Sequence, residues 1–328
     1  MQGLVTVFGG TGFVGRQVVR ALAKQGLRVR VAARNAGRGY RMRMLGDVGQ
    51  IEVVQANIRS PLSVERALTG AETCVNLVGV GYESGRQGFQ AVHVMGARTV
   101  AEAAKAKGVT RFVQLSAIGA DAASDCKYSR TKAGGEAAVR AVYPDAVILR
   151  PAFIFGQEDS LLNTAALVAS LSPVLPVIGG TNGPKLQPVW VSDVAAAVAK
   201  AVTDPACAGR IYELAGPSVL TLRELLQFVL RETGRSRVLL PLPYVAADIL
   251  GIGGDIMAGL RGMIGLVPPP PLTRDYVELL KTDNVADPAL PGLAELGITP
   301  AALEAIAPTY LYRYRKGGQY AELPAGAF

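Results

Sequence analysis

The sequence predicts an α/β fold with a doubly wound parallel sheet, followed by a smaller mixed lobe. Up to residue 150, short apolar runs alternate with longer amphipathic segments, the order typical of a parallel sheet covered by helices on both faces. Glycines recur at every third position directly after the first apolar run. After residue 150 the alternation loosens, and clusters of Pro and Gly interrupt the chain. We therefore divide the chain into residues 1–150 and 151–328, and some later segments could return to the first sheet.

Local signals support each element of the first part. The predicted strands are Leu4–Phe8, Arg28–Ala33, Ile51–Gln55, Thr73–Leu77, Arg111–Leu115 and Ala146–Leu149. The predicted helices are Gly12–Gln25, a helix beginning at Ser60-Pro61, Phe89–Lys107 and Ser129–Tyr143. Gly26 directly follows the first helix, and Pro61 stands at a first helical position, as expected for a helix end and a helix start.

Composition narrows the classes of protein and partner. Half of the residues are apolar and 18% are charged, which excludes a disordered chain. The net charge is +8, but Lys and Arg form no long basic run, so we expect anionic cofactor phosphates or an acidic membrane surface or partner, and no nucleic acid. Three cysteines without CxxC spacing fit a reducing compartment, and the single histidine, His93, argues against a metal site and is expected to be packed in its helix. The first strand begins at Leu4, which leaves no room for a signal or transit peptide, so we expect the cytoplasm or the cytoplasmic side of a membrane.

The strongest motif lies between the first strand and the first helix. It consists of Gly9, Gly10, Thr11, Gly12, Phe13, Val14 and Gly15. In a Rossmann-type site the first glycine permits a tight turn, the second lets the backbone approach a pyrophosphate, and the third allows the helix to pack on the strand. The helix N-terminus then stabilises the phosphate charge. The motif therefore predicts a bound nicotinamide dinucleotide.

The end of the second strand indicates which dinucleotide is bound. A site specific for NAD places Asp or Glu there, whereas this chain has Ala32-Ala33-Arg34, with Arg16 just past the third glycine. Two guanidinium groups suit a 2′-phosphate, so we expect NADP(H), with NADPH preferred over NADH. Alternatively, Arg34 is only a solvent-exposed residue of a loop that contains other arginines and does not contact a phosphate. The other predicted cofactor contacts are Asn57 and Ile58 near the adenine, Val78 and Gly79 at the carboxyl edge of the sheet, and Pro151.

Ser116, Tyr128 and Lys132 form the predicted chemical site. Ser116 ends the fifth strand, and the i,i+4 spacing places Tyr128 and Lys132 on one face of the following helix. In this arrangement a lysine ammonium lowers the pKa of the tyrosine, which exchanges a proton with a substrate oxygen while hydride moves at the nicotinamide, and the serine hydrogen-bonds the same oxygen. These three residues are the candidate catalytic residues, and they also belong to the predicted cofactor contacts. Alternatively, they hold the cofactor without turnover.

Two segments of the second part have compositions that are also found in segments that contact membranes. Pro243–Val267 is apolar apart from Asp248, Asp255 and Arg261, and its glycines and charges argue against a spanning helix. A buried pair of helices is favoured over a segment at a membrane interface or around a hydrophobic ligand. Near the C-terminus, Tyr310, Tyr312 and Tyr314 alternate with Arg313 and Arg315, a mixture that suits a membrane interface but could also cover the lobe.

With these motifs in order, the chain resembles an extended or atypical short-chain dehydrogenase. Val191-Ser192-Asp193-Val194-Ala195 is similar to a segment of that superfamily. A narrower similarity, to the NADPH-binding accessory subunit family of respiratory complex I, rests on runs spread over the chain. These are Leu149–Asp159 with Asn163, Leu242-Pro243-Tyr244, Leu272–Asn284 and Leu296-Gly297-Ile298.

The resemblance implies a dinucleotide held as a structural element in an assembly that oxidises NADH and reduces ubiquinone. It implies complex I subunits as partners, a peripheral position on the cytoplasmic side of the inner membrane, and contact with membrane lipid or quinone. Two alternatives stay open at this point. One is an active NADP-dependent oxidoreductase acting on a hydrophobic substrate such as a quinone or a quinone precursor. The other is a nucleotide sensor that binds a partner according to the redox state of its cofactor.

Overall fold

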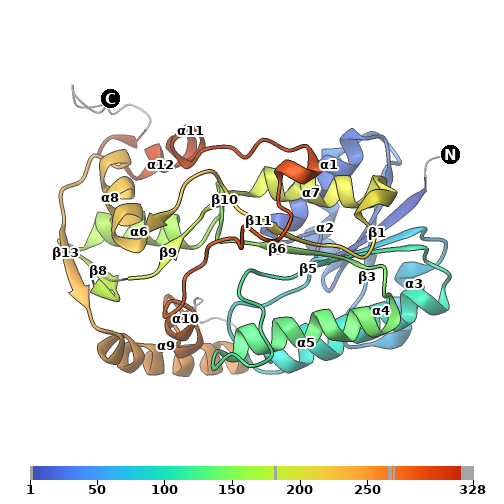
Figure 1. Ribbon diagram of the computed structural model, residues 1–328, viewed down its shortest axis with the longest axis horizontal. Coiled ribbons are helices and arrows are strands. Elements are labelled where there is room, and N and C mark those ends of the chain that lie inside the picture. The colour runs from blue at the N-terminus through green and yellow to red at the C-terminus, as the bar shows by residue number, and fades with distance from the viewer. Residues whose placement is uncertain (1–2, 181–182, 265–267, 269, 319–328) are drawn as a thin grey trace. The chain divides into compact units, whose positions relative to one another are not determined.

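The protein divides into two compact units. Its structure, a computed structural model, describes residues 3–180, 183–264, 268 and 270–318 (Figure 1). Unit 1 comprises Met1–Pro151, Val191–Leu214 and Asp287–Thr299. Unit 2 comprises Ala152–Trp190, Ala215–Ala286 and Pro300–Phe328. Two stretches of the second half of the sequence thus belong to the same unit as the N-terminal part.

Unit 1 is built on a seven-stranded parallel sheet with the order β11-β6-β5-β4-β1-β2-β3. The strands are β1 (Leu4–Phe8), β2 (Arg28–Ala33), β3 (Ile51–Gln55), β4 (Thr73–Asn76), β5 (Arg111–Leu115), β6 (Val147–Pro151) and β11 (Ile211–Leu214). The doubly wound parallel sheet expected from the sequence is confirmed, and β1, β2, β3 and β5 have the predicted bounds. The seventh strand, β11, pairs with β6 at the edge of the sheet, with Ile211 opposite Ile148.

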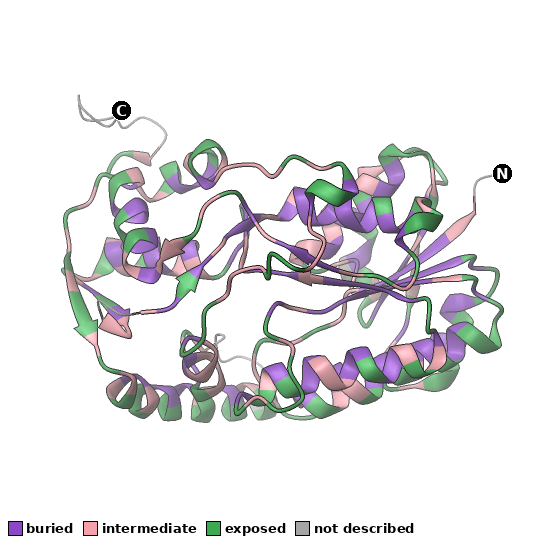
Figure 2. Ribbon diagram, in the orientation of Figure 1, coloured by how far each residue is buried: buried purple, intermediate pink, exposed green. Residues whose placement is uncertain are grey.

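Helices cover both faces of this sheet. They are α1 (Phe13–Lys24), α2 (Ala36–Gly39), α3 (Pro61–Leu68), α4 (Ala97–Ala106), α5 (Lys127–Val142) and α7 (Val191–Thr203), and a π-helical segment, Gln90–Gly96, leads into α4. Figure 1 shows α4 and α5 on one face and α1 with α7 on the other. Because consecutive crossovers use both faces, the strands are buried, as the purple strands in Figure 2 show.

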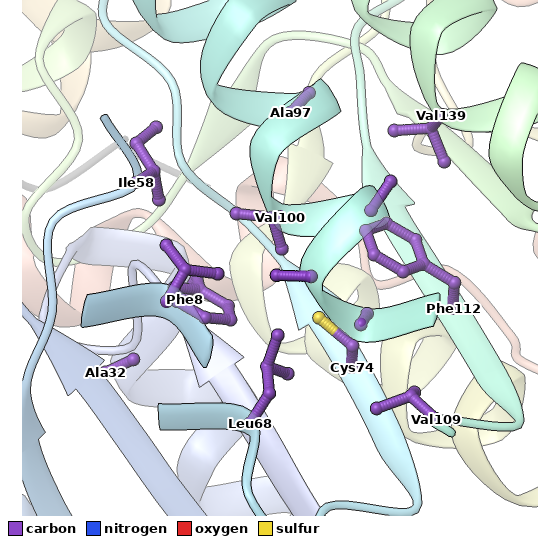
Figure 3. Close-up of a cluster of buried hydrophobic side chains, with 14 of the residues drawn as sticks. Phe8, Ala32, Ile58, Leu68, Cys74, Ala97, Val100, Val109, Phe112 and Val139 are labelled. Carbon is purple, nitrogen blue, oxygen red and sulfur yellow. The ribbon is translucent and has the colours of Figure 1, made fainter. Parts of the chain in front are cut away.

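The hydrophobic core of unit 1 joins the sheet to α3, α4 and α5. Phe8 of β1, Leu68 of α3 and Val100 of α4 are each at most 1% exposed and point into one cluster, together with Phe112 of β5 (Figure 3). Burying such side chains is the main favourable contribution to folding, and truncating a buried phenylalanine to alanine costs about 3–5 kcal/mol. This core joins β1, β4 and β5 to the helices that cover one face of the sheet.

Unit 2 contains short paired strands and six helices among its described residues. The pairs are β7 (Ile154–Phe155) with β10 (Val189–Trp190), β8 (Val174–Ile178) with β13 (Val238–Leu242), and β9 (Lys185–Leu186) with β12 (Leu220–Thr221). The helices are α6 (Leu161–Leu171), α8 (Leu222–Glu232), α9 (Tyr244–Ile264), α10 (Arg274–Leu279), α11 (Leu303–Ile306) and α12 (Pro308–Leu311). At the start of α8, Thr221 and Glu224 form a reciprocal capping box.

The apolar segment Pro243–Val267 does not form the expected buried pair of helices. It contains a single helix, α9, which continues to Ile264, and residues 265–267 lie outside the described part. Several large apolar side chains of α9 are exposed, so composition alone misjudged their burial. None of the helices in the described ranges combines the length and apolar character needed to cross a bilayer.

Two of the aromatic and basic residues near the C-terminus, Tyr310 and Arg315, are packed into unit 2. Tyr310 is 4% exposed and its hydroxyl donates to Asp159 at 2.7 Å. Arg315 donates to the Glu232 carbonyl at 2.7 Å and forms an ion pair with the Glu232 carboxylate at 3.5 Å. These residues therefore cover the lobe, and the expectation that they face a membrane is wrong for Tyr310 and Arg315. The last ten residues, 319–328, lie outside the described structure.

Candidate functional site

Gly9 and Gly15 give the turn between β1 and α1 its shape. Gly9 has a φ of +81°, a conformation that favours glycine, and its carbonyl accepts a hydrogen bond from the Gly12 N–H at 3.0 Å. At Gly15 an added Cβ would lie 2.2 Å from the Gly9 carbonyl oxygen. Only glycine at position 15 therefore allows α1 to pack this closely on the turn.

Gly12, by contrast, is exposed to solvent, and an added side chain would meet only the backbone of its own turn. Its backbone is extended, with φ −77° and ψ 178°, and the nearest atom to an added Cβ is the Gly9 carbonyl oxygen at 3.3 Å. Within the described structure, no side chain caps the N-terminus of α1 and its first turn carries no acidic residue. Backbone N–H groups and the positive end of the helix dipole favour an anion at such a place. The turn fits a dinucleotide pyrophosphate.

Val78 and Gly79 lie beside this turn. The neighbouring strands β1 and β4 are far apart in sequence, so the winding of the sheet changes direction between them. An added Cβ at Gly9 would lie 3.2 Å from the Val78 nitrogen, and the Val78 N–H donates to Asn76 Oδ1 at 3.2 Å. Open α/β sheets bind ligands at the carboxyl ends of their strands where the winding reverses.

The end of β2 presents a cation and no carboxylate. Arg34 directly follows β2 and is exposed, and no acidic residue occurs before Asp47. In the chain between β2 and β3, an added Cβ at Gly39 would lie 3.6 Å from Thr11 Cγ2. This segment therefore packs on the glycine turn. Arg16 is partly exposed in the first turn of α1.

Ser116, Tyr128 and Lys132 lie at the carboxyl end of β5 and the start of α5. The Ser116 N–H donates to the Leu149 carbonyl at 2.7 Å, whereas its buried Oγ has no hydrogen-bond partner among the described residues. Lys132 Nζ donates to the Leu115 carbonyl at 3.3 Å and lies 5.8 Å from the centroid of the Tyr128 ring. A buried hydroxyl without a partner costs free energy, and a ligand oxygen would satisfy it.

Burial governs the protonation of Tyr128 and Lys132. It lowers the pKa of Lys132 to about 8, while the nearby Glu136 carboxylate acts in the opposite direction. It raises the pKa of the Tyr128 phenol to about 12. Desolvation of the phenolate is the largest cause and the Cys126 thiol adds to it, so the lowering of this pKa by Lys132 stays a prediction. At neutral pH the Tyr128 hydroxyl is therefore protonated and able to donate.

His93 connects the loop after β4 to α5. Its Nε2 accepts a hydrogen bond from the Val80 N–H at 3.1 Å, so Nδ1 carries the proton and donates to Thr131 Oγ1 at 3.0 Å. Burial and the charge of Lys132 lower the pKa of His93 to about 3, which keeps the ring neutral. The ring stacks on Phe89 with centroids 5.3 Å apart and meets the Tyr128 ring edge-on at 5.4 Å.

The sequence predicted only that His93 is packed, and it missed this bridging position. The histidine lies within the π-helical segment, and such segments occur frequently at functional sites. On α5, an added Cβ at Gly135 would lie 2.3 Å from the His93 carbonyl oxygen. The Gly134-Gly135 pair, an unusual feature within a helix, is the signal that could have indicated this close approach.

An ion-pair cluster with buried carboxylates contacts the middle of α5. Arg150 of β6 donates to both carboxylate oxygens of Glu136 at 2.9 and 2.7 Å, and its Nη1 lies 3.6 Å from Glu213 of β11. Both carboxylates belong to residues that are 6% exposed. Because Glu136 lies one turn after Lys132 on α5, the cluster fixes the position of the helix that carries the candidate catalytic residues.

The other predicted contacts have clear local roles. Asn57 Oδ1 accepts a hydrogen bond from the Arg59 N–H at 3.1 Å and shapes the turn after β3. Ile58 is 6% exposed and packs against Gly96 in the core. Pro151 ends β6, and its carbonyl accepts a hydrogen bond from the Ile118 N–H at 3.0 Å. In the part of the chain that the structure describes, no group of three or more His, Cys, Asp or Glu residues is arranged to hold a metal ion.

Comparisons with known proteins agree with this geometry. The profile of a family described as NAD(P)H-binding matches residues 9–205, from the glycine turn through α7. The mitochondrial protein "NADH dehydrogenase [ubiquinone] 1 alpha subcomplex subunit 9" of Mus musculus is 34% identical over 314 residues, covering 95% of this chain and 80% of that protein. The chain belongs to this NAD(P)H-binding family.

Two further proteins, both named as oxidoreductases, are similar to the chain over shorter stretches or at lower identity. The "Ceramide reductase" of Caulobacter vibrioides is 38% identical over 195 residues, covering 60% of this chain and 59% of that protein. The NADPH complex of the NADPH-dependent quinone oxidoreductase QOR2 from Escherichia coli has the same fold, with a TM-score of 0.72, 23% identity, and coverage of 94% of this chain and 99% of that chain. The family thus has the Rossmann fold, and the chain binds a nicotinamide cofactor.

Proposed function

We propose that the chain binds NADP(H) in unit 1, with NADPH preferred over NADH, as an accessory subunit of a respiratory NADH dehydrogenase. The observation that carries the proposal is the exposed backbone of Gly12 at the N-terminus of α1, where no side chain of the described residues caps the helix. Gly9 and Val78 border the same place at the switch between β1 and β4, and Arg34 supplies a cation suited to a 2′-phosphate. In this role the cofactor is a structural element.

Calorimetric titration of the purified protein with NADPH and NADH tests this proposal. A charge-assisted contact with the 2′-phosphate contributes about 1.5–3 kcal/mol, so NADPH should bind roughly tenfold or more tightly than NADH. Equal affinities would contradict the NADPH preference, and the absence of binding by either dinucleotide would contradict the site itself.

We further propose that the protein is peripheral on the cytoplasmic side of the inner membrane, with respiratory subunits as partners and with contact to lipid or quinone. The support is the similarity to the mouse respiratory subunit over 95% of this chain. Affinity purification from membranes solubilised in a mild detergent tests the assembly. Subunits of the respiratory NADH dehydrogenase should co-purify, and a preparation without them would contradict the accessory role.

A second candidate is an active NADP-dependent oxidoreductase acting on a hydrophobic substrate such as a quinone. The observation that favours it is the buried Ser116 Oγ without a partner beside Lys132. Ser116 Oγ would donate a hydrogen bond to the substrate oxygen, and the protonated Tyr128 would give that oxygen its proton. Lys132, protonated near neutral pH, would hold the ribose and keep a positive charge beside the phenol. NADPH supplies the hydride when it is bound.

Turnover of NADPH with a short-chain ubiquinone distinguishes the two candidates. Removing the proton donor by Tyr128→Phe should abolish turnover while leaving NADPH affinity within about twofold, because the phenol is not a phosphate contact. If the wild-type protein binds NADPH but does not oxidise it, the structural role holds. If Tyr128→Phe turns over as fast as the wild type, the proposed chemistry is wrong.

A further inference from the structure

Helix α9 of unit 2 exposes a broad apolar surface. Its large exposed side chains, all but Leu250 spaced three or four residues apart, lie on one side of the helix. They are Val245 (74% exposed), Ile249 (65%), Leu250 (58%), Ile252 (46%), Ile256 (60%), Leu260 (42%) and Met263 (84%). Figure 2 shows exposed residues repeating along the whole helix. We call this surface the α9 apolar face.

The opposite side of α9 packs directly against the backbone of the chain around α10. Ala247 and Ala258 are at most 3% exposed. An added Cβ at Gly254 would lie 1.6 Å from the Leu272 carbonyl oxygen, and one at Gly251 would lie 2.8 Å from the nitrogen of Arg274, the first residue of α10. Gly251 and Gly254 thus allow the helix to pack closely on the chain around α10. The α9 apolar face points away from that contact.

The acidic groups of α9 are also directed away from the apolar face. Asp255 forms an ion pair with Arg274 at 3.4 Å, and Asp248 forms one with Lys281 at 3.4 Å. With about 100° between successive residues, the side of the helix that contains the exposed side chains spans about half of the circumference. The arc between Ile252 and Leu250 holds only Val, Ile, Leu, Met, Ala and Gly, and Arg261 lies at its edge beside Leu250. The arc itself offers no side-chain hydrogen-bonding group to a partner.

These properties distinguish between the kinds of partner that could cover the α9 apolar face. Interfaces between proteins carry about one hydrogen bond per 100–200 Å², and a helix-pairing seam is a narrower stripe than this face. A wide, uncharged, convex face whose flanking acids are neutralised suits the hydrocarbon boundary of a bilayer, where no hydrogen bonds are available. We infer that α9 lies in the surface of a lipid bilayer, parallel to it, with its apolar face among the acyl chains. This inference deepens the proposed peripheral membrane association.

Vesicle flotation of the full-length protein tests the inference, with vesicles of phosphatidylcholine alone and of phosphatidylcholine mixed with an anionic phospholipid. The test variant is the double substitution Ile252→Glu, Ile256→Glu. The control is Leu167→Glu, Leu171→Glu, which has the same i,i+4 spacing on α6 at side chains that are 49% and 81% exposed. Burial of one isoleucine in hydrocarbon changes partitioning roughly tenfold or more, so the test variant should bind vesicles about a hundredfold more weakly.

We expect the wild type and the control to float with both compositions, including at high salt, because the contact is uncharged. Retention by the test variant, or no flotation of the wild type, would overturn the inference. A wild-type dimer in analytical ultracentrifugation that the test variant makes monomeric, without flotation of either, would assign the face to a second copy and also overturn it. NADPH titration of the same samples reports on unit 1 separately, so failure of the membrane inference is distinguishable from failure of the cofactor proposal.

Discussion

We expect a Gly12→Val substitution to abolish NADPH binding while the protein stays folded. The backbone of Gly12, with φ −77° and ψ 178°, lies in the extended region that valine prefers. The nearest atom to the new Cβ is 3.3 Å away, so the turn needs to give by only a few tenths of an ångström. The stability cost should therefore be about 1 kcal/mol or less.

The ligand, in contrast, would meet the valine methyl groups at the N-terminus of α1. If the side chain displaces the pyrophosphate from about two backbone N–H groups, each worth about 1.5–3 kcal/mol, the affinity falls by roughly two to four orders of magnitude. Calorimetric titration with NADPH measures this loss, and urea unfolding measures the stability. Wild-type affinity in a folded Gly12→Val protein would refute the placement of the pyrophosphate.

Gly15→Ala provides the matched comparison within the same turn. Its Cβ would lie 2.2 Å from the Gly9 carbonyl oxygen and 2.6 Å from Gly10 Cα, so the turn itself must move. Overpacking of this kind costs about 1–3 kcal/mol of stability. We therefore expect the alanine to lower the urea midpoint although it adds only one methyl group. Equal stability of Gly15→Ala and the wild type would contradict the close packing of α1 on the turn.

Four further substitutions, one of them a control, probe the cofactor preference, the support of α5 and the protonation of His93. Arg34→Ala should weaken NADPH binding roughly tenfold or more and leave NADH binding unchanged; equal losses would show that Arg34 does not contact the 2′-phosphate. Glu136→Gln removes a carboxylate that is 8% exposed and deprives the partly buried Arg150 of its main partner, so it should cost about 3–5 kcal/mol in urea unfolding. Glu52→Gln removes a carboxylate that is 51% exposed and should cost about 1 kcal/mol or less; similar costs would argue against the anchoring role. The pKa of His93 is about 3 in the folded protein against about 6.5 when unfolded, so stability should fall as pH drops below about 6.5, by up to about 1.4 kcal/mol per pH unit. His93→Gln should remove that slope, and an unchanged slope would assign it to other groups.

Local sequence signals were sufficient for the first half of unit 1. Strand alternation, the glycine turn and the helix-terminal residues each depend on a few neighbours in the chain, so β1, β2, β3 and β5 could be placed to the residue. The return of Val191–Leu214 to unit 1 depends on strand pairing between β11 and β6, which are about sixty residues apart. Pairing at that separation leaves no local signature.

Local sequence patterns could not predict the burial of side chains or the protonation of the site residues. The composition of α9 suggested a buried helix, yet the chain around α10 covers only its glycine-containing side. The Tyr-x-x-x-Lys spacing located Tyr128 and Lys132 correctly on one helix, but the pKa of Tyr128 depends on surroundings that other elements contribute. His93 appeared as an ordinary packed residue because its partners, Val80 and Thr131, come from separate segments.

Isolation of the full-length protein from native membranes, with identification of the nucleotide and the proteins that accompany it, tests the central claim most directly. We expect NADPH or NADP⁺ bound in a ratio of about one per chain, and subunits of the respiratory NADH dehydrogenase in the same preparation. A preparation from the soluble fraction that carries neither a nicotinamide dinucleotide nor any respiratory subunit would contradict it.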